Sequence, residues 1–434
     1  MLSGLDSVIF WGNILLLIVS FLLLIIDFYN KPASVMMNIY AFGVVFGAFY
    51  YGLPFINIEY LYEFFGYSID DSSLRAAKIF ALWTLFIFFC YYCFSRKKHM
   101  TREFSLQIEN YSNVSLSDLI CYIVLILAPL VAIIIIIDIG SNLLSNFSDR
   151  VAAQAIYVQY EVKFKLPILF FITLSSYFFM YVKGKMFGLK RIFFLSPFII
   201  CIPEILSGGR DLIFAFIIFN FIIYSLRNSR RKILLFFIPL FATITSMVIA
   251  RYYLTRDITQ TSIEYAIYSM LAEFYHTAFT TAYIFDRDIN NIEMGGDYLF
   301  LPLLKFFMPI LSYANEQFHL PWYADLVSER IGRSFGFAGN IISESYYYFG
   351  YIGCFLYPFF IATILGFHNR FAIKKNKLGL ITLIIVAINI RLFFRGSFWD
   401  NYTSIIIWLV IYFCITGLIF SRGNEVVKIR VQRK

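Results

Sequence analysis

Long apolar runs separated by short polar links make up most of the chain. Each run is close to twenty residues long and apolar all round, which suits a helix that crosses the hydrocarbon core of a bilayer. The runs lack the period-two alternation of membrane-spanning β-strands, so they exclude a β-barrel. We predict about eleven transmembrane helices (about 10–13) on this criterion. They cover residues 8–27, 35–56, 74–94, 119–139, 165–182, 190–207, 211–226, 233–253, 342–367, 378–395 and 401–420.

One long segment interrupts this pattern. It contains two semi-apolar pieces, 262–285 and 298–314, joined by a link with four acidic residues and one Arg. We interpret it as a large outer-face segment of re-entrant or interfacial helices, with a further pair of spans as the alternative. The predicted organisation is an N-terminal bundle of about eight spans (1–254), this large segment (255–341), about three C-terminal spans (342–420) and a basic tail (421–434).

The composition supports an all-α polytopic integral membrane protein. Of the 434 residues, 60% are apolar and only 15% are charged, whereas a soluble domain is about half apolar and about a quarter charged. There is too little polar surface to cover a water-facing globule. A conventional cytosolic enzyme and a disordered chain are therefore excluded.

The net charge of +9 reflects where Lys and Arg lie along the chain. Basic residues gather in alternate links, at 95–102, 183–191, 227–232 and 370–377, and in the C-terminal tail. Cytoplasmic loops of membrane proteins carry such an excess, so these links are predicted to be cytoplasmic. The charge is thereby explained without nucleic acid, and no nucleic-acid partner is expected.

The opposite ends of the spans carry a second set of basic residues that is mostly arginine. Its ten arginines are Arg75, Arg150, Arg210, Arg251, Arg256, Arg287, Arg330, Arg333, Arg391 and Arg395. The planar guanidinium binds phosphate oxygens in pairs and stays charged when partly desolvated. An anion site on the outer face explains the set. Snorkelling to lipid headgroups, or pairing with acids such as Asp211 and Asp257, is the alternative for any one of them.

Local sequence context selects five of these arginines as candidate anion ligands. In the turn over residues 207–211, two glycines precede an arginine that starts the next helix, where the positive end of the helix dipole lies. Two others lie where the predicted span 233–253 passes into the large segment. The last two lie four residues apart on one helical face. The candidates are Arg210, Arg251, Arg256, Arg391 and Arg395.

Glu273 and His276 form a candidate general-base pair. Residues three apart share a helix face, and a carboxylate can orient an imidazole and raise its basicity. A polar stripe that faces headgroup water is the alternative. The four His residues are otherwise scattered, and no P-loop, dinucleotide-binding glycine pattern or nucleophile elbow occurs in a suitable context. We therefore predict no metal site and no cofactor.

The region from about Glu273 to Phe367 resembles the outer-loop region of bacterial O-antigen polymerases, the Wzy-type oligosaccharide repeat-unit polymerases. These proteins tend to show a Glu-x-x-x-Asn-Phe-Gly-x-x-Gly pattern, and this chain has Tyr348 where Asn is common. The residues that carry the resemblance are Glu273-Phe274, Gly295-Gly296-Asp297-Tyr298, Pro302, Pro309, Gly336-x-x-Gly339 and the string Ser343 to Gly353, with Glu344, Tyr348-Phe349-Gly350-Tyr351 and Gly353.

The resemblance implies a membrane glycosyltransferase of lipopolysaccharide biosynthesis. It would join undecaprenyl-diphosphate-linked oligosaccharide units at the periplasmic face of the bacterial inner membrane, with the segment 255–341 in the periplasm. His276, Glu273 or Glu344 would deprotonate the acceptor hydroxyl, and the five arginines would hold the diphosphate. Tyr298 and Tyr348 would contact the glycan. A chain-length regulator and a flippase are the expected protein partners in the same membrane.

Two other functions remain alternatives at this point. An O-antigen ligase, which passes finished polysaccharide to the lipid A core, shares the topology and an Arg-rich outer loop. A polysaccharide flippase or transporter would instead place charged residues along a path through the bilayer. In this chain the centres of the predicted spans are almost free of charge, and the arginine set described above gathers at their predicted outer ends. This distribution favours the polymerase.

Overall fold

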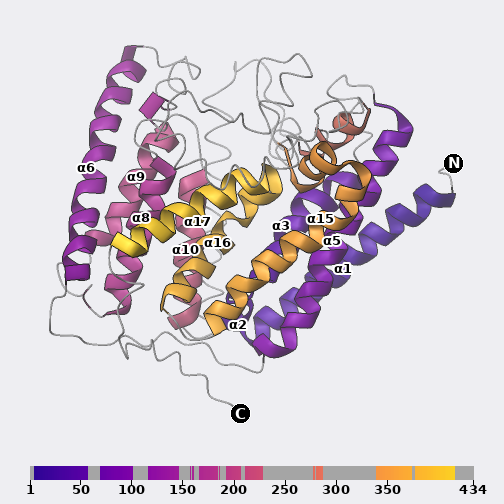
Figure 1. Ribbon diagram of the computed structural model, residues 1–434, viewed down its shortest axis with the longest axis horizontal. Coiled ribbons are helices and arrows are strands. Elements are labelled where there is room, and N and C mark those ends of the chain that lie inside the picture. Colours follow the sequence, from indigo (N-terminus) through magenta and orange to yellow (C-terminus); the bar gives the residue numbers. More distant parts are fainter. Residues whose placement is uncertain are drawn as a thin grey trace. The chain divides into compact units, whose positions relative to one another are not determined.

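Figure 1 shows the computed structural model, in which every regular element of the described residues is a helix. The structure describes residues 4–56, 69–100, 116–145, 157, 159–160, 166–183, 185, 192–206, 211–227, 277–278, 280–286, 339–373 and 377–415. The predicted span 233–253 and most of the segment 255–341 lie outside these residues.

The described helices coincide with the other predicted runs. They are α1 (Gly4–Asn30), α2 (Pro32–Met36), α3 (Ile39–Gly47), the single turns η1 (Ala48–Gly52) and η2 (Pro54–Ile56), α5 (Asp71–Met100), α6 (Leu116–Ser145), α8 (Leu166–Val182), α9 (Leu195–Leu206), α10 (Asp211–Arg227), α15 (Ile341–Ile373), α16 (Lys377–Arg395) and α17 (Phe398–Ile415).

Five helices in the described part of the chain are long and apolar enough to cross a membrane. They are Gly4–Asn30, Ile39–Ile56, Asp71–Met100, Leu116–Gly140 and Ile341–Arg370. Shorter apolar helices cover Leu166–Val182, Ile192–Leu206, Asp211–Leu226 and Ile405–Cys414. The all-helical class predicted from the sequence is confirmed for these residues, while the full count of eleven spans stays a prediction.

The chain forms two compact units. Unit 1 comprises Met1–Arg102, Tyr268–Arg370 and Asn389–Ile407, and unit 2 comprises Glu103–Ile267, Phe371–Ile388 and Trp408–Lys434. The helices α16 and α17 contribute to both units. Each unit is described by itself below.

In unit 1, α1 carries its polar residues inward and its apolar residues outward. Asn13, Ser20 and Asp27 recur every seven residues along the buried stripe, which also holds Leu17. On the other face, large apolar side chains are exposed, with Trp11 at 66%. A helix of a water-soluble bundle shows the reverse pattern. This arrangement suits a helix whose outer face contacts lipid and whose polar groups hydrogen-bond to its neighbours.

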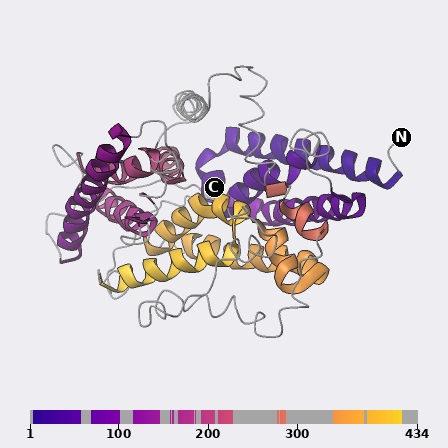
Figure 2. The same cartoon turned by 90° about the horizontal axis from the view of Figure 1, so that it is seen from above.

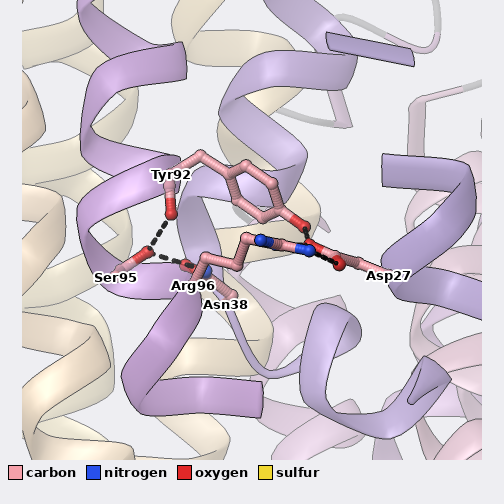
Figure 3. A network of polar contacts seen from close by, with 5 residues as sticks. All are labelled: Asp27, Asn38, Tyr92, Ser95 and Arg96. Carbon is pink, nitrogen blue, oxygen red and sulfur yellow. Dashed lines mark hydrogen bonds and ion pairs between the residues drawn. The ribbon is translucent and has the colours of Figure 1, made fainter. Parts of the chain in front are cut away.

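The buried carboxylate of Asp27 joins α1 to α5 (Figure 3). It is 0% exposed and accepts a hydrogen bond of 2.7 Å from the Tyr92 hydroxyl. The Arg96 guanidinium binds both of its oxygens, with Nη2 2.7 Å from Oδ1. Ser95, on the same turn of α5, accepts a 2.8 Å hydrogen bond from the Asn38 side chain, which precedes α3. The network therefore fixes three helices at one end of unit 1.

A second Asp–Arg pair joins the same two helices at their other end. Nε of Arg75 lies 2.9 Å from Oδ1 of Asp6, and this pair is partly exposed. Asp6 and Asp27 are 21 residues apart on α1, and Arg75 and Arg96 are 21 residues apart on α5. At 1.5 Å per residue this spacing is about 30 Å, the thickness of the hydrocarbon core. The helices α1 and α5 are therefore parallel, and their ion pairs are spaced by one membrane thickness.

The start of α5 is capped at the same end as Asp6. Asp70 accepts hydrogen bonds from the backbone N–H of Ser72 and Ser73, at 3.0 and 3.3 Å. The Ser72 hydroxyl and these N–H groups hold the pKa of the Asp70 carboxyl below its usual range. The backbone N–H of Asp70 in turn donates to Asp286 over 2.9 Å. This contact ties residues 280–286 to the start of α5.

Unit 2 is built around α6, which packs against α8 and α9, while α9 also packs against α10. Figure 2 shows these helices from above. The Ser196 hydroxyl of α9 donates to the Leu125 carbonyl of α6 over 2.7 Å. At the start of α6, Asp118 forms ion pairs with Lys183 (3.0 Å) and Lys185, which follow α8. The start of α6 therefore meets the end of α8.

The two Asp–Arg pairs of unit 1 predict unequal effects on stability. Replacing Asp27→Asn removes the charge from a fully buried acceptor of three donated hydrogen bonds, and we expect the free energy of unfolding to fall by about 1–3 kcal/mol. Replacing Asp6→Asn in the partly exposed pair should change it by less than about 1 kcal/mol. Thermal unfolding of the two purified variants in the same detergent measures the difference, and equal shifts would contradict it.

Candidate functional site

The corner between α16 and α17 is held by a buried glutamate from α15. The Glu344 carboxylate is 0% exposed and accepts a hydrogen bond from the Ser397 hydroxyl. Its Oε2 also accepts the backbone N–H of Phe398 over 2.8 Å. The first N–H groups of a helix have no partner within the helix, so Glu344 satisfies one of these groups at the start of α17. The corner is thereby tied to α15.

Tyr51 holds the same corner from the side of α16. Its hydroxyl donates to the Phe394 carbonyl over 3.0 Å and accepts the backbone N–H of Ile341 over 3.2 Å. The side chain is fully buried, and its ring lies 5.2 Å from that of Phe394. Arg395 therefore lies between two anchored positions: the Phe394 carbonyl before it, and the Ser397–Phe398 step after it.

The start of α15 is equally well determined. The Asn340 side chain accepts the N–H groups of Ile342 and Ser343, at 3.0 and 2.9 Å, and the Ser343 hydroxyl accepts the Asn340 N–H over 2.8 Å. This is a reciprocal capping arrangement. The Asn340 amide also donates to the Thr277 carbonyl over 2.9 Å. Because Glu344 lies in the first turn of this helix, the cap fixes the backbone that carries its carboxylate.

The chain reverses within α15 at Gly350. Its φ of 63° and ψ of −155° are strained for any residue with a Cβ atom. The Tyr357 hydroxyl lies 3.3 Å from Oε2 of Glu344, whereas thirteen residues of straight helix would separate the two by about 20 Å. The predicted span 342–367 is therefore two helical limbs that meet at Gly350. The first limb precedes Gly350, and the second, longer limb begins at Tyr351.

Gly353 permits the two limbs to touch. A Cβ atom at this position would lie 2.4 Å from the Ser345 carbonyl oxygen of the first limb. Three positions of the Glu-x-x-x-Asn-Phe-Gly-x-x-Gly pattern thus have a structural role in this chain. Glu344 holds the next corner, Gly350 makes the reversal, and Gly353 allows the close backbone approach.

The structure describes four of the predicted site residues. Arg391 and Arg395 lie one turn apart at the end of α16, the first 8% exposed and the second half-buried. Because residues four apart share a helix face, both guanidiniums leave α16 on the same side. Glu344 reaches the turn that follows them. Tyr348 is buried, with its ring 5.4 Å from that of Tyr347 and 6.0 Å from that of Phe349, so a sugar could stack on it only if these rings moved.

The other predicted site residues lie outside the described part of the chain. They are Glu273, His276, Arg210, Arg251, Arg256 and Tyr298. The residues that follow Arg210 are described, however. The backbone N–H groups of Asp211 and Leu212 donate to Oε1 and Oε2 of Glu204, at 2.9 and 2.7 Å. A buried carboxylate of α9 therefore caps α10 directly after Arg210.

Sequence reasoning did not single out Glu204, Tyr51 or Ser397. A signal for Glu204 existed, because an acidic residue inside an apolar run is costly without a partner. Tyr51 and Ser397 had none, since their partners are far away in the sequence. Within the described residues, no group of three or more His, Cys, Asp or Glu side chains is arranged to hold a metal ion.

The reversal in α15 predicts strong sensitivity at Gly353. Replacing Gly353→Ala forces a methyl group against the Ser345 carbonyl, and we expect a loss of about 1–3 kcal/mol from the free energy of unfolding. The matched control is Gly140→Ala in α6, where an added Cβ meets nothing within 4 Å, so that stability should be unchanged or slightly higher. Thermal unfolding in detergent compares the two, and an unaltered Gly353→Ala protein would contradict the close approach.

Comparison with known protein families matches residues 4–423 to the family described as O-antigen polysaccharide polymerase Wzy. No curated protein and no solved structure shows significant similarity to the chain. The match covers nearly the whole sequence and includes every helix and every candidate site residue described above. The chain belongs to the O-antigen polysaccharide polymerase Wzy family.

Proposed function

We propose that this O-antigen polymerase joins undecaprenyl-diphosphate-linked oligosaccharide repeat units at the periplasmic face of the bacterial inner membrane. The observation that carries the proposal is the Arg391–Arg395 pair on one face of α16, in a chain that matches the polymerase family over residues 4–423. The leaving group of such a donor is a diphosphate, and paired guanidiniums are well suited to bind its oxygens.

The proposed reaction is a glycosyl transfer that needs no cofactor. The acceptor hydroxyl oxygen attacks the anomeric carbon of the donor sugar and forms the new C–O bond. The bond from that carbon to the diphosphate breaks, and the lipid diphosphate leaves with the electron pair. The hydroxyl proton passes to a base, for which Glu273 and His276 are our first candidates and Glu344 the third.

Charge grows on the diphosphate as it leaves, so cations placed there in advance lower the barrier. We assign this role to Arg391 and Arg395, together with Arg210, Arg251 and Arg256. Tyr298 is a proposed glycan contact, and Tyr348 is a second one that requires the rings of Tyr347 and Phe349 to move. A chain-length regulator and a flippase are the proposed partners, since the first would act on the product and the second would supply the substrate.

The helix connections of unit 1 support an outward-facing site. Asn38, at the start of α3, bonds to Ser95 beside the basic link that begins at Arg96. The chain then runs through α3 to η1, where Tyr51 holds the Arg395 corner. Tyr51 lies twelve residues after Ile39 in the segment Ile39–Ile56, which is about 18 Å along a helix. If the basic link is cytoplasmic, as the positive-inside rule indicates, the contact of Tyr51 with the corner lies in the half of this segment that is nearer the periplasm.

We expect Arg395→Ala to reduce polymerisation by about 100- to 1,000-fold, because one well-placed electrostatic contact contributes about 2.7–4 kcal/mol to the transition state. Arg395→Lys should recover only part of this loss, since an ammonium cannot bind two oxygens as a planar fork does. The control is Arg370→Ala, an exposed arginine at the far end of α15, which should leave O-chain length unchanged.

Lipopolysaccharide banding on gels reads out these variants in cells that carry the chain as their only polymerase. Unchanged O-chain length in both Arg210→Ala and Arg395→Ala would overturn the diphosphate assignment. Deleting the gene should leave the lipid A core capped by a single repeat unit. Polymer accumulating on the carrier lipid instead would show a ligase.

A further inference from the structure

Two buried glutamates, one in each unit, have the same arrangement. At the start of a following helix, Glu204 (7% exposed) accepts two backbone N–H groups and Glu344 (0% exposed) accepts one. In both cases the capped turn carries one of the proposed diphosphate ligands. Arg210 directly precedes the capped start of α10, and Arg395 lies two residues before Ser397 at the start of α17.

We propose that Glu204 and Glu344 are positioning residues, each of which fixes the backbone from which one diphosphate-binding arginine projects. Glu204 acts through Arg210 and Glu344 acts through Arg395. This inference rests on the proposed function, because it takes the two arginines to bind the lipid diphosphate.

The hydrogen bonds of Glu344 favour positioning over proton transfer. Oε1 accepts the Ser397 hydroxyl, and Oε2 accepts the Phe398 N–H at 2.8 Å and the Tyr357 hydroxyl at 3.3 Å. A general base must direct a lone pair at the proton that it removes. Both oxygens of Glu344 are directed at protein donors in a fully buried place. Glu273 and His276 therefore remain the preferred candidates for proton removal.

Glu204 makes an even more symmetrical contact. Each of its oxygens accepts one of two consecutive backbone N–H groups, from Asp211 at 2.9 Å and from Leu212 at 2.7 Å. Two charge-assisted hydrogen bonds to adjacent peptides fix both the orientation of the backbone at the start of α10 and its distance from Glu204. Arg210 is the residue immediately before these two in the sequence.

The same contacts limit how the diphosphate can be held. The start of a helix is a common phosphate site because its free N–H groups point at the ligand. At the starts of α10 and α17, N–H groups that could serve in this way donate to the protein's own carboxylates. Phosphate recognition near these turns therefore depends on the arginine side chains, and their placement depends on the glutamates.

A glutamine at either position has nearly the same shape but a different hydrogen-bonding capacity. Its amide nitrogen is a donor, so at Glu204, where each oxygen accepts an N–H group, one of the two fixing contacts is lost. At Glu344 the amide oxygen can keep the Phe398 N–H, and the Ser397 hydroxyl can turn to accept from the amide nitrogen. The glutamine there loses the negative charge that strengthens these contacts. A displacement of about 1 Å in a group that binds the reacting atoms can cost about 100-fold in rate. We expect Glu204→Gln to lower the rate of polymerisation by about 10- to 100-fold, and Glu344→Gln to lower it by a smaller factor.

Double-mutant cycles test whether each glutamate acts through its own arginine. The within-turn pairs combine Glu344→Gln with Arg395→Ala, and Glu204→Gln with Arg210→Ala. The cross pairs, Glu344→Gln with Arg210→Ala and Glu204→Gln with Arg395→Ala, are the matched controls. The readouts are kcat and KM for a purified lipid-diphosphate-linked repeat unit, measured with the full chain in proteoliposomes.

The expected result is that each glutamine variant loses most of its effect, to less than about twofold, once the arginine of its own turn is gone. In the cross pairs the two effects should multiply. If the within-turn effects also multiply, the positioning role is overturned. That outcome is also the one expected of Glu344 as an independent general base, or of purely structural glutamates.

Two further measurements keep the result interpretable. Ser397→Ala and Tyr357→Phe each remove one donor to Glu344 and leave the carboxylate in place, so they repeat the cycle with Arg395→Ala if Glu344→Gln fails to fold. Thermal unfolding of each variant separates lost stability from a raised KM. Full activity of Arg210→Ala and Arg395→Ala would overturn the diphosphate assignment of the proposed function, whereas inactive arginine variants with multiplying effects would overturn only this inference.

Discussion

A carboxylate that leaves water inside an apolar helix bundle must find hydrogen-bond donors there, and this constraint organises the described structure. An uncompensated buried charge costs several kcal/mol, so each buried acid is bonded to a specific second segment. Asp27 bonds to α5, Glu204 to the start of α10, and Glu344 to the start of α17. Apolar contacts alone would let these helices slide or rotate. The buried acids define which residues face each other.

The same constraint explains why α1 buries polar residues and exposes apolar ones. Its buried stripe carries Asn13, Ser20 and Asp27, while large apolar side chains such as Trp11 are exposed. In lipid, apolar surface drives little association between helices, so polar groups and close packing supply the specificity. The two Asp–Arg pairs along α1 and α5 are spaced by about 30 Å, one hydrocarbon thickness. Their charges therefore lie where the bilayer can tolerate them.

The corner between α16 and α17 combines these elements around Arg395. Tyr51 and Glu344 anchor the backbone on either side of it, and the capped first turn of α15 supplies the glutamate. Gly350 and Gly353 let α15 turn back so that Tyr357 can reach the same carboxylate. Thus the family-like string of residues 343–353 supports the place from which an arginine projects, and only its glutamate had been a candidate for the chemistry itself.

The sequence alone determined the helical class, the run lengths, the arginine-rich ends and the resemblance to O-antigen polymerases, because these depend on local composition and on spacing within one helix. It also selected Glu344, Arg391 and Arg395 as candidate site residues. Only the tertiary structure decided that Glu344 holds the turn after Arg395, that α15 reverses, and that Glu204 caps α10. The periodicity of a single helix carries no information about partners outside it. The reversal and the contact between Tyr51 and Phe394, 343 residues apart, depend on φ/ψ choices and side-chain packing that appear only when the chain is folded.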